Sequence, residues 1–142
     1  METDLEKARR ILKESRCTCV LCCGEKETAS RLPGVRPLLD LLDSGKDYSA
    51  YSAADKVIGR GAAFLYCLLG VRRIYADVIS RTALEVLEEN RISVTYTTLV
   101  DRIQNRTKDG LCPIECATLH CRAPEEALTA IREALQKLRT EK

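Results

Sequence analysis

The spacing of apolar positions predicts a helix at each end of the chain and a hairpin after the first. Residues 3–15 carry apolar side chains at helical spacing, and a second such stripe follows Pro124. The apolar run at 17–23 is rich in Cys, Thr and Val, which favours a strand. A turn at Gly24 then predicts a return strand at 26–31.

The middle of the chain alternates between helical and extended patterns. A short helix is predicted over 37–43, and residues 52–69 predict a buried helix because they are apolar almost all round after the first turn. A strand at 72–79, a helix at 82–90 and a strand at 91–96 follow. This alternation indicates a parallel α/β layer.

Two further helices are predicted beyond this layer. Residues 97–105 have a helical pattern, and Pro113 suits the first position of a helix in the segment CPIECATLH. A chain of 142 residues has the size of one domain. We therefore expect residues 1–142 to form a single α/β domain.

Composition and charge argue against several classes of function. No window approaches the ~18 uninterrupted apolar residues of a membrane span, and the N-terminus is too charged for a signal peptide, so we expect a cytoplasmic protein without membrane contact. The 23 basic and 21 acidic residues leave a net charge of +2, which gives no reason to expect nucleic acid as a partner. Assembly into a homo-oligomer stays open.

Eight cysteines and a single histidine, His120, limit the metal chemistry of the chain. Without an export signal, we interpret the cysteines as reduced thiols. Cys112, Cys116 and His120 share one face of a helix, but ligands spread over about 12 Å do not close on one ion. We predict no metal and no cofactor, while a site formed by Cys112, Cys116 and Cys121 stays an alternative.

A second group of cysteines lies in the first predicted strand. Alternation along that strand puts Cys17, Cys19, Leu21 and Cys23 on one face, where we expect them to act as small apolar side chains. The adjacent pair Cys22-Cys23 gives a weak indication of redox chemistry.

The start of the predicted helix 52–69 is the first candidate for a binding site. Ser52 is expected to cap this helix, and Asp55 and Lys56 lie just inside its first turn. Exposed amides at a helix N-terminus attract anions, so these residues are suited to hold a polar ligand. The alternative is a capped helix with a surface ion pair.

The second candidate is the polar segment that precedes the CPIECATLH helix. Asn105, Arg106, Cys112 and Glu115 place several groups suited to chemistry within a dozen residues. If Cys112 caps the helix that Pro113 opens, the helix amides favour its thiolate and therefore its reactivity. The alternatives are a solvated loop and an ordinary buried thiol.

Together these motifs resemble a small prokaryotic family of unknown function, the DUF1893 family, which is typified by a Thermotoga protein. The resemblance rests on YSAADKVIGRGAA with its DK-x-x-G motif, then NR, then LCPIE with its CP-x-E motif, and it covers nearly the whole chain. It implies a cytidine-deaminase-like three-layer sandwich, with a mixed four- or five-stranded sheet and helices on both faces.

The resemblance also implies that the matching residues share a pocket: Asp55, Lys56, Asn105, Arg106, Cys112, Pro113 and Glu115. Zinc deaminases carry H-x-E and P-C-x-x-C at the starts of two helices. The corresponding positions here, placed at 53–56 and 80–83, contain no His, Glu or Cys. We therefore expect no zinc-dependent cytidine deaminase, and the family supplies no activity to inherit.

The expected function is the binding of a nucleotide-like or other anionic small molecule between Asp55/Lys56 and the segment 105–115. In an enzyme, Cys112 is the candidate nucleophile, with Asp55, Lys56 and Glu115 handling protons and charge, and with Ser52, Asn105 and Arg106 binding the ligand. The alternatives are a binding module without turnover and a thiol- or redox-responsive protein.

Overall fold

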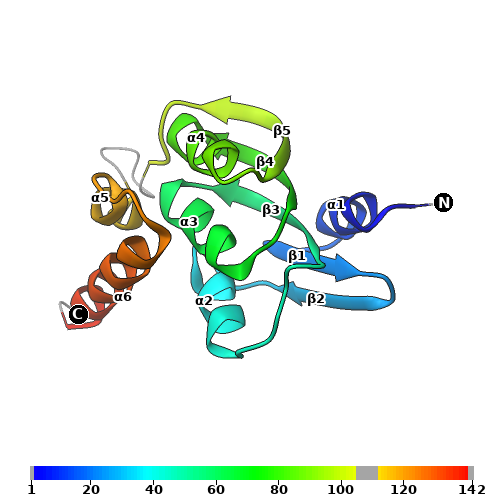
Figure 1. Cartoon of the computed structure of the whole chain (residues 1–142), viewed down its shortest axis with the longest axis horizontal. Coiled ribbons are helices and arrows are strands. Elements are labelled where there is room, and N and C mark those ends of the chain that lie inside the picture. The colour runs from blue at the N-terminus through cyan, green and yellow to red at the C-terminus, as the bar shows by residue number, and fades with distance from the viewer. Residues whose placement is uncertain (1, 105–111, 141–142) are drawn as a thin grey trace.

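A computed structural model describes residues 2–104 and 112–140 and contains one five-stranded sheet with the strand order β2-β1-β3-β4-β5 (Figure 1). The strands are β1 (Cys19–Cys23), β2 (Lys26–Ser30), β3 (Ser52–Ile58), β4 (Arg73–Ser80) and β5 (Ser93–Val100). The helices are α1 (Asp4–Glu14), α2 (Arg36–Asp43), α3 (Arg60–Leu69), α4 (Arg81–Glu89), α5 (Pro113–Thr118) and α6 (Pro124–Thr140).

The sheet is mixed, with a parallel half and an antiparallel hairpin. Strand β1 pairs antiparallel with both β2 and β3, whereas β3, β4 and β5 run parallel to one another. Gly24 at φ +61° allows the tight turn of the β1–β2 hairpin. The parallel strands are joined through α3 and α4, so the predicted α/β alternation and hairpin are confirmed.

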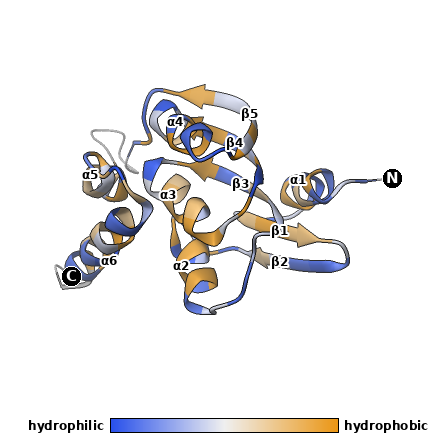
Figure 2. Ribbon diagram, viewed as in Figure 1, coloured by the Kyte–Doolittle hydropathy of each residue, from blue (hydrophilic) through white to orange (hydrophobic). Residues whose placement is uncertain are grey.

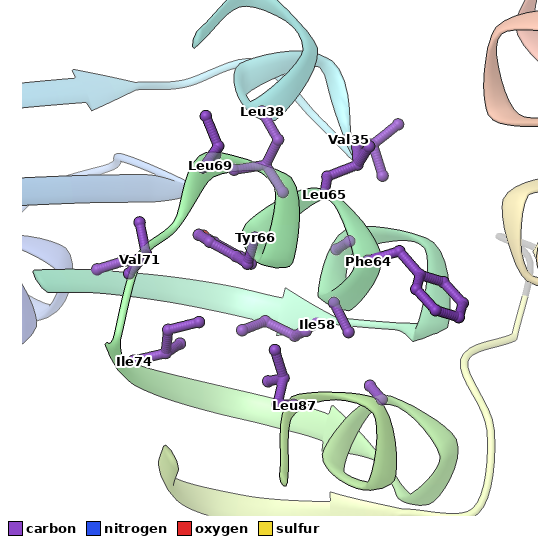
Figure 3. Close-up of a cluster of buried hydrophobic side chains, with 14 of the residues drawn as sticks. Val35, Leu38, Ile58, Phe64, Leu65, Tyr66, Leu69, Val71, Ile74 and Leu87 are labelled. Carbon is purple, nitrogen blue, oxygen red and sulfur yellow. The ribbon is translucent and has the colours of Figure 1, made fainter. Parts of the chain in front are cut away.

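Helices cover both faces of the sheet. On one face, Ala8 and Leu12 of α1 pack with Val20, Ala54 and Tyr75 in a small core cluster. The larger cluster lies on the other face, where it includes side chains of α2, α3 and α4 and of α6, which packs against α3. Figure 3 shows Tyr66, Leu65 and Ile58 in this cluster. Figure 2 shows α3 almost entirely in hydrophobic colours, and seven of its ten residues are buried.

The predicted helix 52–69 is wrong in its first half. Ser52–Ile58 forms the central strand β3, Gly59 caps the following helix, and α3 begins only at Arg60. A strand that is buried on both faces appears in the sequence as a continuous apolar run, and such a run does not differ in periodicity from a buried helix. Ser52 is therefore not a helix cap, and Asp55 lies on a strand.

Two smaller predictions are also corrected. The predicted helix at 97–105 is wrong over 97–104, because β5 continues through its β-branched residues to Val100 and residues 101–104 are not helical. Cys17 precedes β1 and packs against the α1 face, whereas Cys19 and Leu21 belong to the opposite cluster. The predicted helices at 3–15, 37–43, 82–90 and after Pro113 and Pro124 agree with the structure to within a residue or two at the ends that the structure describes.

Candidate functional site

A cleft of about 290 Å³ lies at the carboxyl end of β3. In sheets with parallel strands this edge is the usual place for ligands, because helix N-termini open there. The lining comes from the start of β1, the segment before α2, the end of β3, the start of α3, and the region of α5: Thr18, Pro33, Gly34, Val35, Asp55, Lys56, Val57, Gly59, Ala62, Ile103, Cys112, Ile114 and Glu115. Four residues predicted from the sequence, Asp55, Lys56, Cys112 and Glu115, are therefore brought together.

Asp55 supplies a buried carboxyl group to the wall of this cleft. Its Cα partners are Cys19 in β1 and Ala76 in β4, so the residue is in the centre of the sheet. The Tyr66 hydroxyl donates a 2.6 Å hydrogen bond to Oδ2, and the Val57 amide donates a 3.3 Å bond to Oδ1. Burial outweighs these bonds and raises the pKa of Asp55 to about 7.

Tyr66 and Cys19 extend this group into the core. The Cys19 thiol lies 3.3 Å from the Tyr66 hydroxyl, and both side chains are buried. The sequence did not predict this hydrogen-bonded group of side chains, because it placed Asp55 and Tyr66 on one helix, where eleven residues span about 16 Å. With the residues divided between β3 and α3, the chain folds back and the two side chains meet.

Lys56 supplies a positive charge at the mouth of the cleft. Its backbone amide donates a 3.0 Å bond to the Thr18 carbonyl, which fixes the end of β3 beside the start of β1. Its side chain is exposed, and Lys56 is the one cationic residue among the described lining. Neighbouring side chains of a strand point to opposite faces, and the charge of Lys56 also acts on Asp77, so the Asp55 carboxyl group lies in the cleft wall and Lys56 borders the cleft.

Glu115 lies in the cleft wall but also caps α3. Its Oε1 accepts a 2.5 Å hydrogen bond from the Arg60 amide, and the carboxylate also interacts with the amide of Gly61. Burial raises the pKa of Glu115, and these two amides oppose that rise. A Cβ atom at Gly59 would lie 2.0 Å from Oε1, so the close approach requires glycine there.

The Arg60 side chain connects α3 to the end of α5, just as Glu115 connects α5 to the start of α3. Its guanidinium donates to the carbonyl of Thr118 at 3.0 Å and to that of Cys121 at 2.7 Å, and it lies over the Phe64 ring. Gly61 lets Ile114 approach the helix closely, since a Cβ there would lie 2.5 Å from Ile114 Cγ2. The glycines of this segment thus allow close contact with α5.

Cys112 is the N-cap residue of α5, as predicted, and its half-buried side chain lines the cleft. Ser52 lies at the other end of β3 and is not part of the lining. Asn105 and Arg106 lie outside the described residues, so their predicted membership of the pocket stays a prediction.

The eight cysteines are all free thiols. Burial raises the pKa of Cys67 to about 11 and also raises the pKa values of Cys19, Cys22 and Cys121, which makes these four thiols poor nucleophiles at neutral pH. Among residues 2–104 and 112–140, no group of three or more His, Cys, Asp or Glu side chains is arranged to hold a metal ion. No helix in that part of the chain has the length and apolar character to cross a membrane.

Comparison with known proteins identifies one family. The family model described as a domain of unknown function, DUF1893, matches residues 7–135. The crystal structure of TM1506, a DUF1893 family protein from Thermotoga maritima, superimposes with a TM-score of 0.84 at 25% identity, covering 96% of this chain and 92% of that one. No curated protein matches the sequence.

Proposed function

Because the chain belongs to the DUF1893 family, whose description assigns no activity, we propose a function from the cleft itself: it binds a small, nucleotide-like or otherwise anionic molecule. In this proposal the ring or apolar body of the ligand enters the cleft, Asp55 contacts its hydrogen-bonding edge, and Lys56 pairs with its negative group. A volume of about 290 Å³ is near the lower end of the range for ligand sites, which suits a small molecule.

The observation that carries the proposal is the Asp55 carboxyl group, held by Tyr66 at the wall of a largely apolar cleft. A buried carboxyl group with a pKa of about 7 is divided between its two protonation states at neutral pH. Such a group donates a hydrogen bond to a ring nitrogen or accepts one from a ring N–H. Perturbed carboxyl groups in clefts are typical of binding and catalytic sites.

The finer description of the fold, a cytidine-deaminase-like three-layer sandwich, is part of the same proposal. The mixed sheet with helices on both faces supports it. Zinc-deaminase signatures sit at helix starts, and the helix starts that line the cleft are those of α2, α3 and α5. Val35–Leu38 and Gly59–Ala62 contain no His, Cys or Glu, and the start of α5 offers one thiol, Cys112, and Glu115, which already caps α3. The described residues around the cleft therefore do not fit a zinc site, and we derive no step through zinc.

The structure also corrects the position at which the sequence was compared with the H-x-E motif. Residues 53–56 are in the strand β3 and not at a helix start, so they do not correspond to an H-x-E helix. The expectation that the zinc ligands are missing now rests on the starts of α2, α3 and α5.

A second candidate function uses Cys112 as a nucleophile. Its thiol lines the same cleft as the carboxyl groups of Asp55 and Glu115, so a thiol and two candidate bases lie in one site. Glu115 already accepts hydrogen bonds from α3, so Asp55 is the better candidate for moving a proton. The remaining alternatives are a binding module without turnover and a thiol-responsive protein.

Calorimetric titration and thermal shift assays test the proposed function. The probes are nucleoside 5′-monophosphates, the corresponding nucleosides and inorganic phosphate. We expect a monophosphate to bind the wild-type protein more tightly than its nucleoside, and Lys56→Met to remove that difference. We expect Asp55→Asn to weaken the nucleoside as well.

Lys26→Met is the matched control, because Lys26 is exposed on β2 and is not part of the cleft lining. Equal binding by the Lys56→Met and Lys26→Met variants contradicts the proposal, as does the absence of binding by every probe.

A further inference from the structure

The two edge strands of the sheet differ in how they are protected. Strand β2 has five residues, and its exposed Lys26 and Glu27 carry charges, with Lys7 at 2.9 Å from Glu27. Strand β5 has eight residues, SVTYTTLV, without a charge, proline or glycine. In Figure 2, β5 is coloured orange to white, whereas much of β2 is blue. Because proteins usually blunt an exposed edge with charges, proline or short length, β5 lacks a protection that β2 has.

The open edge of β5 presents backbone groups in a position to pair. In the described part of the chain, no strand lies beyond β5 in the sheet. The Ser93 amide donates to the Arg72 carbonyl at 2.9 Å, so alternate residues from Ser93 turn their amide groups toward β4. The residues between them, Val94 and Tyr96, therefore direct N–H and C=O groups to the open edge. The Tyr96 side chain is 41% exposed.

We propose that β5 pairs antiparallel with β5 of a second copy of this chain, about a two-fold axis beside Tyr96. Two-fold symmetry requires one residue to face its own copy at the axis. With Tyr96 in that position, each Tyr96 N–H meets the Tyr96 carbonyl of the other copy, and the sheet continues through both chains.

Charge complementarity favours this register. Five residues on either side of Tyr96, Arg91 of one copy lies opposite Asp101 of the other, and symmetry makes this pair twice. Asp101 is 81% exposed and contacts Arg81 at 2.8 Å, which leaves it accessible to a second cation. An axis at Val94 would place Arg91 opposite Thr97 and lose both pairs. Arg91 is in the turn before β5 and Asp101 in the bend after it, so the two charge pairs would flank the paired strands, where opposite charges favour this register.

Pairing with a second copy also explains why the edge strand β5 carries no charged residue. Pairing between two identical β5 strands uses both unprotected edges and leaves only the charged β2 edges exposed. A closed two-fold dimer of this kind does not extend into a fibre.

Sedimentation velocity over a concentration series tests the proposal. We expect the wild-type chain to form a dimer, and Tyr96→Lys to weaken it by about tenfold or more, because two lysines then face each other at the axis. Ala29→Lys is the matched control on β2 and should leave the dimer unchanged. Circular dichroism and melting curves establish that each variant is folded.

A charge exchange tests the register. Arg91→Glu and Asp101→Lys should each weaken the dimer several-fold, and the double variant should restore it. A wild-type chain that stays monomeric overturns the proposal. So does a dimer that Ala29→Lys disrupts and Tyr96→Lys does not, or one that is indifferent to the charge exchange.

Discussion

The Tyr66 hydroxyl donates a 2.6 Å hydrogen bond to the Asp55 carboxyl group, and this bond joins the second half of the core helix α3 to the central strand β3 inside the protein. Both side chains are buried, and burial raises both pKa values. The bond therefore links the stability of the core to the protonation of a group in the cleft wall.

Asp55→Asn should change how stability depends on pH. The pKa of Asp55 rises from 3.8 to about 7 on folding, so the folded state holds the proton more tightly than the unfolded state. The contribution of Asp55 to the free energy of unfolding is therefore greatest below pH 4, decreases as the pH rises toward 7 and does not change further above that pH. The loss amounts to as much as about 4 kcal/mol. Urea unfolding of both proteins across this range should show the asparagine variant gaining stability relative to wild type.

Asp77→Asn is the control with the opposite sign. Partial burial raises the pKa of Asp77, but Lys13 and Tyr75 lower it further, so the net shift is downward. Its stabilising effect is present above the unfolded pKa and is lost as pH falls through the folded one. A stability profile of Asp55→Asn that runs parallel to wild type from pH 4 to 7 contradicts the assigned environment of Asp55.

Tyr66→Phe should raise the pKa of Asp55 further. The Tyr66 hydrogen bond favours the ionised carboxylate, and without it burial acts with less opposition. Loss of the bond should destabilise the protein by about 1–3 kcal/mol. Carboxyl carbon shifts followed by NMR against pH measure the change. Tyr51→Phe, a tyrosine that contacts Tyr48 and lies outside the cleft lining, should leave the Asp55 titration unchanged.

Gly59→Ala and Glu115→Ala should be strongly coupled. The alanine methyl at 59 would lie 2.0 Å from Glu115 Oε1, so the carboxylate must move and the cap on α3 is lost. We expect Glu115→Ala alone to cost about 0.5–2 kcal/mol, as for other helix caps. In that background, Gly59→Ala should cost less than it does in the wild type. A double-mutant cycle by chemical denaturation measures the coupling, and additive costs would refute the contact.

Cys112 should be protected from alkylation by a ligand in the cleft, and Cys116 should not. Cys112 lines the cleft, whereas Cys116 is exposed on α5 and is absent from the lining. Two variants, each with one of these cysteines as its only thiol, allow iodoacetamide rates to be compared with and without the tightest-binding nucleotide. Alkylation of Cys112 that is faster than that of Cys116 and is slowed by Lys56→Met supports the nucleophile. Rates that are insensitive to ligand leave Cys112 outside the binding site.

The sequence predicted the elements whose pattern is set locally. The α1 stripe, the Gly24 turn and the Pro113 and Pro124 helix starts depend on spacing and backbone chemistry within a few residues, and they agree with the structure. The residues 52–58 were assigned to a helix and form the strand β3, because a strand at the centre of a sheet is buried on both faces and lacks the alternation of apolar and polar residues that marks a strand.

The candidate site was predicted in part. Asp55, Lys56, Cys112 and Glu115 do line one cleft, although the reason given for Asp55 and Lys56, a helix N-terminus, was wrong. Tyr66 was not found from the sequence, because its contact with Asp55 depends on the reversal of the chain between β3 and α3. The capping of α3 by Glu115 likewise depends on tertiary contacts across 55 residues.

Helix α5 has six residues, which is too few for a helix to persist alone in water. Its orientation therefore depends on two sets of hydrogen bonds between α3 and the region of α5. The Arg60 amide donates to Glu115, and the Arg60 guanidinium donates to the carbonyls of Thr118 and Cys121. Arg60 is not part of the cleft lining. The shape of the wall around Cys112 nevertheless depends on this arginine, so in the proposed binding site a residue outside the lining would influence which molecule fits.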